Sequence, residues 1–450
     1  MDVPKFQTNR IGPVFLGILL LAALFFGYAD FAFVRYFAVE RHNHGDMDLY
    51  YRLGLMLREG ERDIYNPAVY REYYSHDPKV HQEKYRHHYR INYPPLTYAL
   101  FSPLSRIPLN SLKGFWFYLN CLLLIATVVI IFLMKPFSEL PEKFRYLLGG
   151  LFLIFAFCFS PVNESLFRGQ INILLLFLVV VGLFFHDRGN TVLSGIFIAL
   201  ASSLKLIPLV LALVFIIRRE WKAVLTMIIV LLIIHVGLLA IYGPDLARSF
   251  FNFWPHSMDG LITHEFNKSV EAMFYRLFSR NAIARPMIEA PGLIRPLGII
   301  RTLLILPVMV LVLVKMTKRG GDDPVIRFLS FFLVFQTFFL LSFLVFGHHL
   351  VLILPAIAVL SAIAGNPVRN PSRGKIPLYL YLFCGTVTGA LAGIIPNTFH
   401  FMKHPLWAMR ILYNHNLFAQ PVMILSWIFL IWFISDYLST LDEATPDAKA

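Results

Sequence analysis

The sequence predicts an all-α polytopic membrane protein, and three observations support this fold class. The 450 residues are 57% hydrophobic and 15% charged, whereas a soluble globular protein is about half apolar and about a quarter charged. The mean hydropathy is +0.64. The apolar residues also fall in blocks of roughly 20, the length at which a helix crosses the hydrocarbon core of a membrane. We therefore expect membrane lipids to surround the protein.

The chain is basic, with a formal net charge of +13. In a soluble protein this charge would suggest nucleic acid, but in a membrane protein it fits cytoplasmic anchoring and attraction to anionic headgroups. We predict no nucleic-acid partner. The 3 cysteines lie inside apolar blocks without paired or metal-type spacing, so neither a disulfide framework nor a zinc site is implied.

The apolar blocks predict about 11–13 transmembrane helices, because the regions 96–111 and 191–217 can each be interpreted in more than one way. The first block follows Lys5 and Arg10 and is longer than a signal-peptide core, so we expect a retained helix. We expect a single membrane domain over residues 1–438 and a short polar cytoplasmic tail at 439–450. The blocks lie at 12–34, 112–134, 146–161, 171–185, 191–217, 223–242, 292–314, 327–346, 349–365, 376–396 and 418–437.

The short loops between these blocks are rich in Lys and Arg, which is typical of cytoplasmic loops. All of them can face the cytoplasm on one condition, which is that the block 191–217 enters and leaves on the same side. The basic residues concerned are Lys135, Lys143, Arg145, Arg188, Arg218, Arg219, Lys222, Lys315, Lys318, Arg319, Arg369, Arg373 and Lys375.

The block 191–217 contains a lysine in its middle. Apolar residues run to Leu204, Lys205 follows, and more apolar residues continue past Pro208. One straight helix of this length would span about 40 Å and would place the basic residues after it on the outer side. We predict two short arms that meet near Lys205. An ionisable residue inside a membrane is a candidate functional residue; the alternative is a lysine that extends from a helix end to the interface.

Four longer segments then lie on the outer side, at 35–111, 161–170, 243–291 and 397–417, joined by the junction Gly347 to His349. They contain 13 of the 15 histidines, so the polar chemistry is collected on one face. Within the first segment, Tyr93-Pro94-Pro95-Leu96 predicts an interfacial or re-entrant helix that begins at proline and reaches Leu104. The aromatic residues of the third segment are typical of an interfacial belt.

Asp46 and Asp48 follow the first apolar block, in the sequence His-Asn-His-Gly-Asp-Met-Asp-Leu-Tyr-Tyr. A carboxylate at the membrane surface can take a proton from a sugar or lipid hydroxyl as a general base. A second carboxylate can orient the acceptor or tune the first. The alternative is an N-cap for a helix that starts near Leu49, a position that Asp favours. One pair of carboxylates is a weak signal for a metal.

Two further groups of polar residues border the membrane blocks. Arg168, Gln170 and Asn172 stand where the second outer segment re-enters the membrane, where arginine can bind phosphate oxygens and amides can bind sugar hydroxyls. The alternative is helix capping and helix–helix hydrogen bonding. His348 and His349 lie between two apolar blocks, so at least one imidazole should face a polar cavity. It would contact phosphate or carry protons; the alternative is an interfacial hairpin cap.

With these motifs in order, the chain resembles glycosyltransferase family 87, the bacterial polyprenyl-phosphate-mannose-dependent mannosyltransferases of the GT-C superfamily. The resemblance covers about residues 12–365. It rests on the order of Asp46-Met-Asp-Leu-Tyr50-Tyr51 with Gly60 and Tyr65, Tyr93-Pro94-Pro95-Leu96, Gly169-Gln170-Ile171-Asn172, Ser194-Gly195 before Lys205-Leu206-Ile207-Pro208, and His348-His349 with Pro355.

The resemblance implies a GT-C-type bundle whose extracytoplasmic loops carry the active site. It also implies transfer of a hexose, here mannose, from a polyprenyl-phosphate sugar donor to a lipid-linked or glycan acceptor, with inversion. The family's base carries over to Asp46, with Asp48 second. The donor phosphate and sugar are expected at Lys205, His349, His348, Arg168, Gln170 and Asn172, and the acceptor near Tyr50 and Tyr93. Leu53, Gly54 and the basic segment 71–90 depart from the family pattern and leave the acceptor open.

The residues themselves support the same chemistry. Asp46 would deprotonate an acceptor hydroxyl, and preorganised cations would stabilise the phosphate that leaves, so we expect no metal and no other cofactor. We expect a multi-pass protein of the bacterial cytoplasmic membrane with its active site on the extracytoplasmic side. The alternative function is a transporter or flippase of a lipid-linked sugar, which would also have a broken helix and buried charge but should show internal repeats.

Overall fold

The protein is described here from a computed structural model, which describes residues 31–40, 45–75, 93–138, 140–253, 262, 267–280, 288–364, 376–384 and 406–444. Every regular element in these ranges is a helix. The predicted all-α fold class is therefore confirmed. Most of the predicted first block, 12–34, and the second half of the block 376–396 lie outside the described residues.

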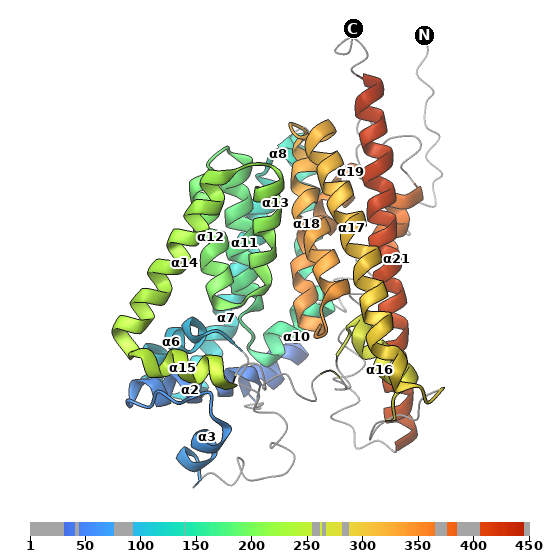
Figure 1. Ribbon diagram of the computed structural model, residues 1–450. Helices are drawn as coiled ribbons and strands as arrows, with labels where there is room; N and C mark the ends of the chain where they lie inside the picture. The colour runs from blue at the N-terminus through green and yellow to red at the C-terminus, as the bar shows by residue number, and fades with distance from the viewer. Residues whose placement is uncertain are drawn as a thin grey trace.

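The long helices form a bundle with two groups, which stand side by side (Figure 1). Six helices of the described ranges are long and apolar enough to cross a membrane, or seven if the bent pair α9 and α10 is counted as one span. The first group contains α7 (Leu109–Phe132), α9 (Glu142–Cys158), α11 (Asn172–Asp187), α12 (Thr191–Leu204), α13 (Ala212–Ile217) and α14 (Trp221–Tyr242). The second contains α17 (Ile294–Gly320), α18 (Pro324–Leu341), η5 (Gly347–Ile353) with α19 (Leu354–Ala364), and α21 (Leu406–Ala444).

Burial differs strongly among these helices. Helices α18 and α19 are almost wholly buried in the bundle, whereas α14 and α17 expose long apolar faces. Such exposed faces are expected where lipid tails replace water as the solvent. The predicted polytopic membrane protein is confirmed by this pattern.

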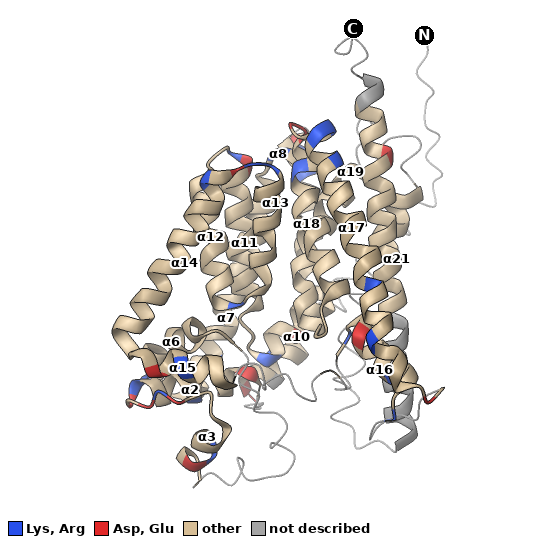
Figure 2. Ribbon diagram, in the orientation of Figure 1, with Lys and Arg blue, Asp and Glu red and all other residues tan. Residues whose placement is uncertain are grey.

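The predicted basic loops gather at one end of the bundle, which we call the basic end (loops at 135, 186–190, 218–220 and 321). The backbone N–H of Lys135 donates to Asp187 Oδ2 at 2.8 Å. The guanidinium of Arg218 donates to the carbonyl of Gly321 at 2.9 Å. Four loops from both helix groups thus meet, as positive-inside patterning predicts, and Figure 2 shows charged residues concentrated at the two ends of the bundle. The predicted basic loop 369–375 lies outside the described residues.

The predicted break at Lys205 is confirmed. Helix α12 ends at Leu204, Lys205 is extended at φ −154° and ψ 133°, and a 3-10 turn, η2 (Ile207–Leu211), leads into α13. His186, just before α12, contacts Glu220, just after α13, at 2.7 Å. Both arms therefore start and finish at the basic end, and Lys205 lies at their far tip.

The opposite end, the site end, carries short helices that lie across the bundle (Figure 1). The predicted proline-initiated helix is confirmed, because α6 runs from Pro95 to Leu104. Helix α10 (Ser160–Arg168) is bent by 55° from α9. The others are α2 (Asp46–Arg58), α3 (Pro67–Tyr73), α15 (Pro244–Phe253) and α16 (Val270–Phe278).

Two boundaries differ from the sequence-based expectations. Helix α21 begins at Leu406, before the predicted block, and runs to Ala444, past the predicted start of the tail at Ser439. Leu441, Glu443 and Ala444 are good helix formers, so an established helix continues through them at little cost. The remaining residues of the predicted tail lie outside the described part of the chain.

The junction of α2 and α10 depends on a glycine. A Cβ atom on Gly45 would lie 2.4 Å from the backbone carbonyl oxygen of Arg168. The exposed Gly150 in α9 has open space around its Cβ position. Gly45→Ala forces two backbones apart and should destabilise the protein by about 1–3 kcal/mol, whereas Gly150→Ala should be neutral or stabilising. Thermal unfolding in detergent compares them, and equal melting temperatures would contradict this packing.

Candidate functional site

Asp46 and Asp48 lie in the first turn of α2, at the site end. Gly45 is the N-cap of this helix, and no side chain caps it. The alternative that these carboxylates form the N-cap is therefore wrong. Asp46 is half-buried and, among the residues that the structure describes, no hydrogen bond or ion pair to its carboxylate is seen. Its position in the first turn of α2 places it at the positive end of the helix dipole.

Asp48 has a different environment from Asp46. Its carboxylate is 3% exposed and forms an ion pair with Lys113 of α7, with Nζ and Oδ1 2.7 Å apart. A buried carboxylate that is paired in this way is held by its partner, because separation would leave either charge uncompensated. Asp48 therefore fastens α2 to α7, and Asp46 is the carboxylate of the pair that can act on a substrate.

The side chain of Gln170 connects three segments of the site. Its Oε1 accepts hydrogen bonds from the hydroxyls of Tyr50, at 3.1 Å, and Tyr93, at 2.6 Å. Burial raises the pKa of both phenols above the ordinary value, and the negative charge of Asp46 adds to the shift. Both phenols thus remain protonated donors. They place α2 and the turn before α6 against the start of α11.

Lys205 occupies the tip of the broken block and faces the same network. Its Nζ donates to Asn172 Oδ1 at 2.9 Å and to the Tyr93 hydroxyl at 3.4 Å. It also lies 4.9 Å from the centroid of the Tyr93 ring, a cation–π distance. Asp46 is close enough to act electrostatically on Lys205. The lysine is 9% exposed and is directed inward, so the alternative of a lysine extended to the interface is wrong.

The two histidines lie in η5 and are both buried. Their rings are 4.7 Å apart and nearly perpendicular. His348 Nδ1 lies 3.2 Å from Glu164 Oε1, and His349 is close enough to Lys205 for electrostatic interaction. Arg168 donates from Nε to the same oxygen of Glu164 at 3.1 Å. The predicted donor-site residues therefore converge, and Glu164 joins them.

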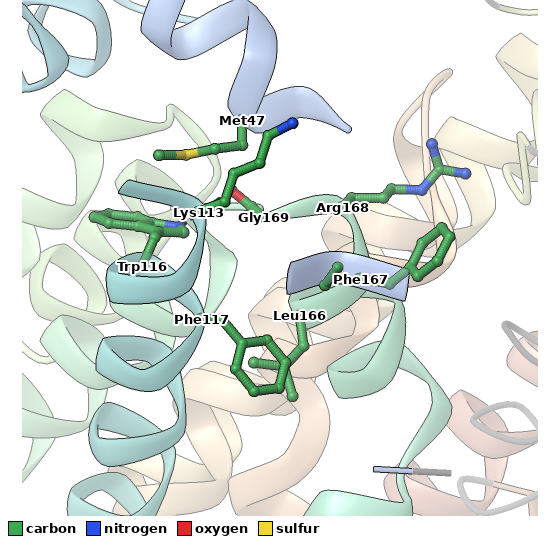
Figure 3. Close-up of a pocket in the computed structure, with 9 residues that line it drawn as sticks. Met47, Lys113, Trp116, Phe117, Leu166, Phe167, Arg168 and Gly169 are labelled. Carbon is green, nitrogen blue, oxygen red and sulfur yellow. Dashed lines mark hydrogen bonds between the residues drawn. The ribbon is translucent and has the colours of Figure 1, made fainter. Parts of the chain in front are cut away.

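Figure 3 shows how Arg168 and Lys113 are separated. Both line a small cavity beside Met47 and Gly169, but Arg168 extends away from Lys113. The cavity measures about 20 Å³, which is room for about one water molecule, so it is too small for a sugar or a lipid. Gly169 ends α10 with a positive φ of 65°, and a Cβ there would lie 2.7 Å from Met47. This glycine lets α10 turn back toward α11 beneath α2.

Lys268 brings a further cation to the Glu164 side of the site. It is 2% exposed and lies just before α16, with its backbone N–H bonded to the carbonyl of Val345. Burial lowers the pKa of its ammonium to about 8, while Glu164 pulls it in the opposite direction. The neighbouring Asn267 bonds the carbonyl of Phe343 at 2.9 Å. The segment before α16 is thereby fastened to the chain that leads to the histidines.

The sequence did not identify Glu164, Lys268 or Lys113 as site or support residues. Glu164 lies 184 residues from His348, so no local spacing connects them. A usable signal is nevertheless present, because Glu164 is a carboxylate in the short polar stretch between two apolar blocks, in the middle of α10. The eight residues predicted for the donor and acceptor sides all lie near the site end of the bundle. The second predicted carboxylate, Asp48, is paired with Lys113.

In the described ranges, no group of three or more His, Cys, Asp or Glu side chains is arranged to hold a metal ion. The carboxylates are instead engaged by cations, as Asp48 is by Lys113 and Glu164 by Arg168. Independence from metals stays a prediction.

Comparison with known families gives a match to glycosyltransferase family 87 over residues 91–342, which is more than half of the chain. The matched residues include Tyr93, Arg168 and Lys205. Asp46 precedes them, and the His348-His349 pair follows them. No solved structure matches the chain.

Two similar proteins come from Mycobacterium tuberculosis. One is a polyprenol-phosphate-mannose-dependent alpha-(1-2)-phosphatidylinositol mannoside mannosyltransferase, 29% identical over 177 residues, which cover 37% of this chain and 40% of that protein. The other is a polyprenol-phosphate-mannose-dependent alpha-(1-2)-phosphatidylinositol pentamannoside mannosyltransferase, 24% identical over 203 residues, 44% of this chain and 45% of that protein. The chain thus matches less than half of the length of either relative.

The ion pair of Asp48 and Lys113 should be structural. Asp48→Asn alone leaves a buried ammonium and should destabilise the protein by about 3–5 kcal/mol, whereas the double variant Asp48→Leu with Lys113→Met removes both charges and should recover most of this loss. Thermal unfolding in detergent measures both. A double variant that is no more stable than Asp48→Asn would show that the pair does more than hold α2 on α7.

Proposed function

Because the chain belongs to glycosyltransferase family 87, we propose that it is an inverting membrane glycosyltransferase. It moves a hexose, mannose, from a polyprenyl-phosphate donor to a lipid-linked or glycan acceptor. The observation that carries the proposal is the convergence, at one end of an apolar bundle, of several cations and Asp46, a carboxylate with no ion pair to any described residue. The names of the two mycobacterial relatives, which specify a polyprenol-phosphate-mannose donor, support the choice of donor.

The proposed reaction proceeds in one displacement. Asp46 takes the proton from an acceptor hydroxyl, and the oxygen attacks the anomeric carbon from the face opposite the phosphate. The bond between the anomeric carbon and the phosphate oxygen breaks, and the polyprenyl phosphate leaves with an additional negative charge. Lys205, Arg168 and the two histidines stabilise that charge. Inversion needs only one carboxylate, which agrees with the pairing of Asp48 and Lys113.

Gln170 and Asn172 have supporting roles in this proposal. Asn172 holds the ammonium of Lys205, and Gln170 holds the two phenols. Tyr50 and Tyr93 bond Gln170 and lie within electrostatic range of Asp46, so they remain our candidates for the acceptor side. In this arrangement, the acceptor hydroxyl enters at Asp46 and the phosphate lies toward Glu164.

We place the protein in the bacterial cytoplasmic membrane with the site end on the extracytoplasmic side. The collection of basic loops at the opposite end supports this orientation, because short basic loops stay in the cytoplasm.

Asp46→Asn tests the base. In lipid nanodiscs with radiolabelled polyprenyl-phosphate mannose, the wild type should move label to a mannoside or lipid acceptor. The variant should be slower by about 10²–10⁴-fold while donor binding persists, because the amide cannot accept the proton. Asp245→Asn, which changes an exposed carboxylate of α15 at the same end, should keep full activity. If Asp46→Asn keeps its turnover, another residue is the base. If the wild type binds the donor but transfers no sugar, the transporter function is favoured.

Lys205→Met tests the phosphate contact. Loss of a buried charged donor should weaken binding of the polyprenyl-phosphate donor by about 10- to 100-fold, measured by competition with labelled donor. Lys222→Met, at an exposed position on α14 near the basic end, is the matched control and should bind normally. Unchanged donor affinity in Lys205→Met would remove this lysine from the phosphate site.

A further inference from the structure

We propose that Glu164 is a positioning residue for the phosphate of the donor: its carboxylate holds Arg168 and His348 in the orientation that receives the phosphate. The inference rests on the proposed function, because it assigns a role within the same site. Glu164 itself would not contact the donor. It would act through the two side chains that it holds.

The geometry around Glu164 is specific. Its side chain is 5% exposed, and one oxygen, Oε1, is shared by Arg168 Nε at 3.1 Å and His348 Nδ1 at 3.2 Å. A bond at Nε fixes the plane of the guanidinium, whose remaining nitrogens then have a defined direction. A carboxylate at Nδ1 fixes the plane of the imidazole, and Nε2 can donate to a phosphate oxygen when both ring nitrogens carry a proton. One carboxylate therefore sets the orientation of two residues from different helices, α10 and η5.

Glu164 also balances the charge of this side of the site. Lys268 is buried within electrostatic range of Glu164, and Lys205 and Arg168 both act on His348. Cations taken out of water without an anion are costly. Glu164 lies within electrostatic range of Arg168 and Lys268 and compensates part of their charge.

Orientation and repulsion make opposite contributions to phosphate binding. A carboxylate repels a phosphate anion, but Oε1 of Glu164 is already engaged by Arg168 and by the imidazole of His348. The positive charge of the Arg168 guanidinium offsets this repulsion at close range. Loss of Glu164 should consequently weaken phosphate binding, because the guanidinium and the imidazole lose their common anchor.

The chain contains a matched control at the basic end. Glu220 also holds one histidine and one arginine, with His186 Nε2 at 2.7 Å and Arg218 Nε at 2.8 Å. The chemistry of this cluster resembles that of Glu164, but it lies at the far end of the bundle from Asp46. Glu220→Gln should therefore disturb packing without affecting the phosphate site.

The experiment measures binding of a short-chain polyprenyl phosphate to the full-length protein in nanodiscs, together with the melting temperature and with KM and kcat for transfer. Glu164→Gln should raise the Kd and the donor KM by about tenfold or more, the effect expected when the outer partner of a liganding histidine is lost. Glu220→Gln should leave Kd and KM at their wild-type values. If Glu164→Gln does not fold, Glu164→Asp keeps the charge but is one methylene too short to hold both partners, and the same rise in Kd is expected.

The outcomes separate this proposal from the proposed function. An unchanged or tighter Kd in the folded Glu164 variant would overturn the positioning role, and a tighter Kd would show that Glu164 competes with phosphate. Equal effects of Glu164→Gln and Glu220→Gln would assign both carboxylates to stability alone. If the wild-type protein binds polyprenyl phosphate but does not transfer sugar, only the proposed transfer reaction is overturned. If the wild-type protein does not bind polyprenyl phosphate, both the transfer reaction and the positioning role of Glu164 are overturned.

Discussion

The hydrogen bonds to Gln170 determine the arrangement of the site. A single amide oxygen accepts from Tyr50 of α2 and from Tyr93 before α6, and Tyr93 in turn accepts from Lys205. Helix α2, which carries the proposed base Asp46, is thereby held at a fixed place relative to Lys205 at the tip of the broken block. Trp116 of α7 donates to the adjacent carbonyl of Gly169 at 3.1 Å and secures the same turn. The bonds of Gln170 and Lys205 are buried, where an unsatisfied polar group is costly, so separating these segments would cost free energy.

The second constraint is electrostatic. An apolar bundle tolerates charge only where the charge is paired or faces a polar cavity. Asp48 is paired with Lys113, and Glu164 with Arg168 and His348. Lys205 lies within electrostatic range of Asp46 and of both histidines, so the carboxylate of Asp46 and the nitrogen-bearing side chains of the site are brought together. A proton acceptor and an anion-binding region are the two requirements of transfer from a sugar phosphate, and the fold brings both to one end of the bundle.

The broken block illustrates what can be predicted from sequence. The block is too long for one span, has a lysine in its middle and is followed by basic residues, and these features favour two short arms that meet near Lys205. In the structure α12 ends at Leu204, the residue before this lysine. The helix that begins at Pro95 could also be predicted from local sequence, because proline is favoured at the first position of a helix. The start of α21 at Leu406 was harder to predict, because polar residues precede its apolar part.

The ion pairs of the site could not be predicted in the same way. Lys113 belongs to a helix that follows the first outer segment, and only the packing of α2 on α7 makes it the partner of Asp48. Sequence therefore placed Asp46 and Asp48 together as candidates, while the structure separates their roles. His348 was singled out correctly as a polar residue in an apolar region, but its partner Glu164 belongs to a distant segment. Long-range pairs of this kind depend on tertiary structure and leave no periodic signal.

The central claim is that one unpaired carboxylate performs the transfer in a single displacement. The anomeric configuration of the product, determined by NMR after transfer from a donor of known configuration, tests it most directly. The account predicts a product whose anomeric configuration is opposite to that of the donor. A product with the donor's configuration would contradict it, because retention requires two displacements and a second nucleophile, and Asp48, the nearest carboxylate in sequence, is bound to Lys113.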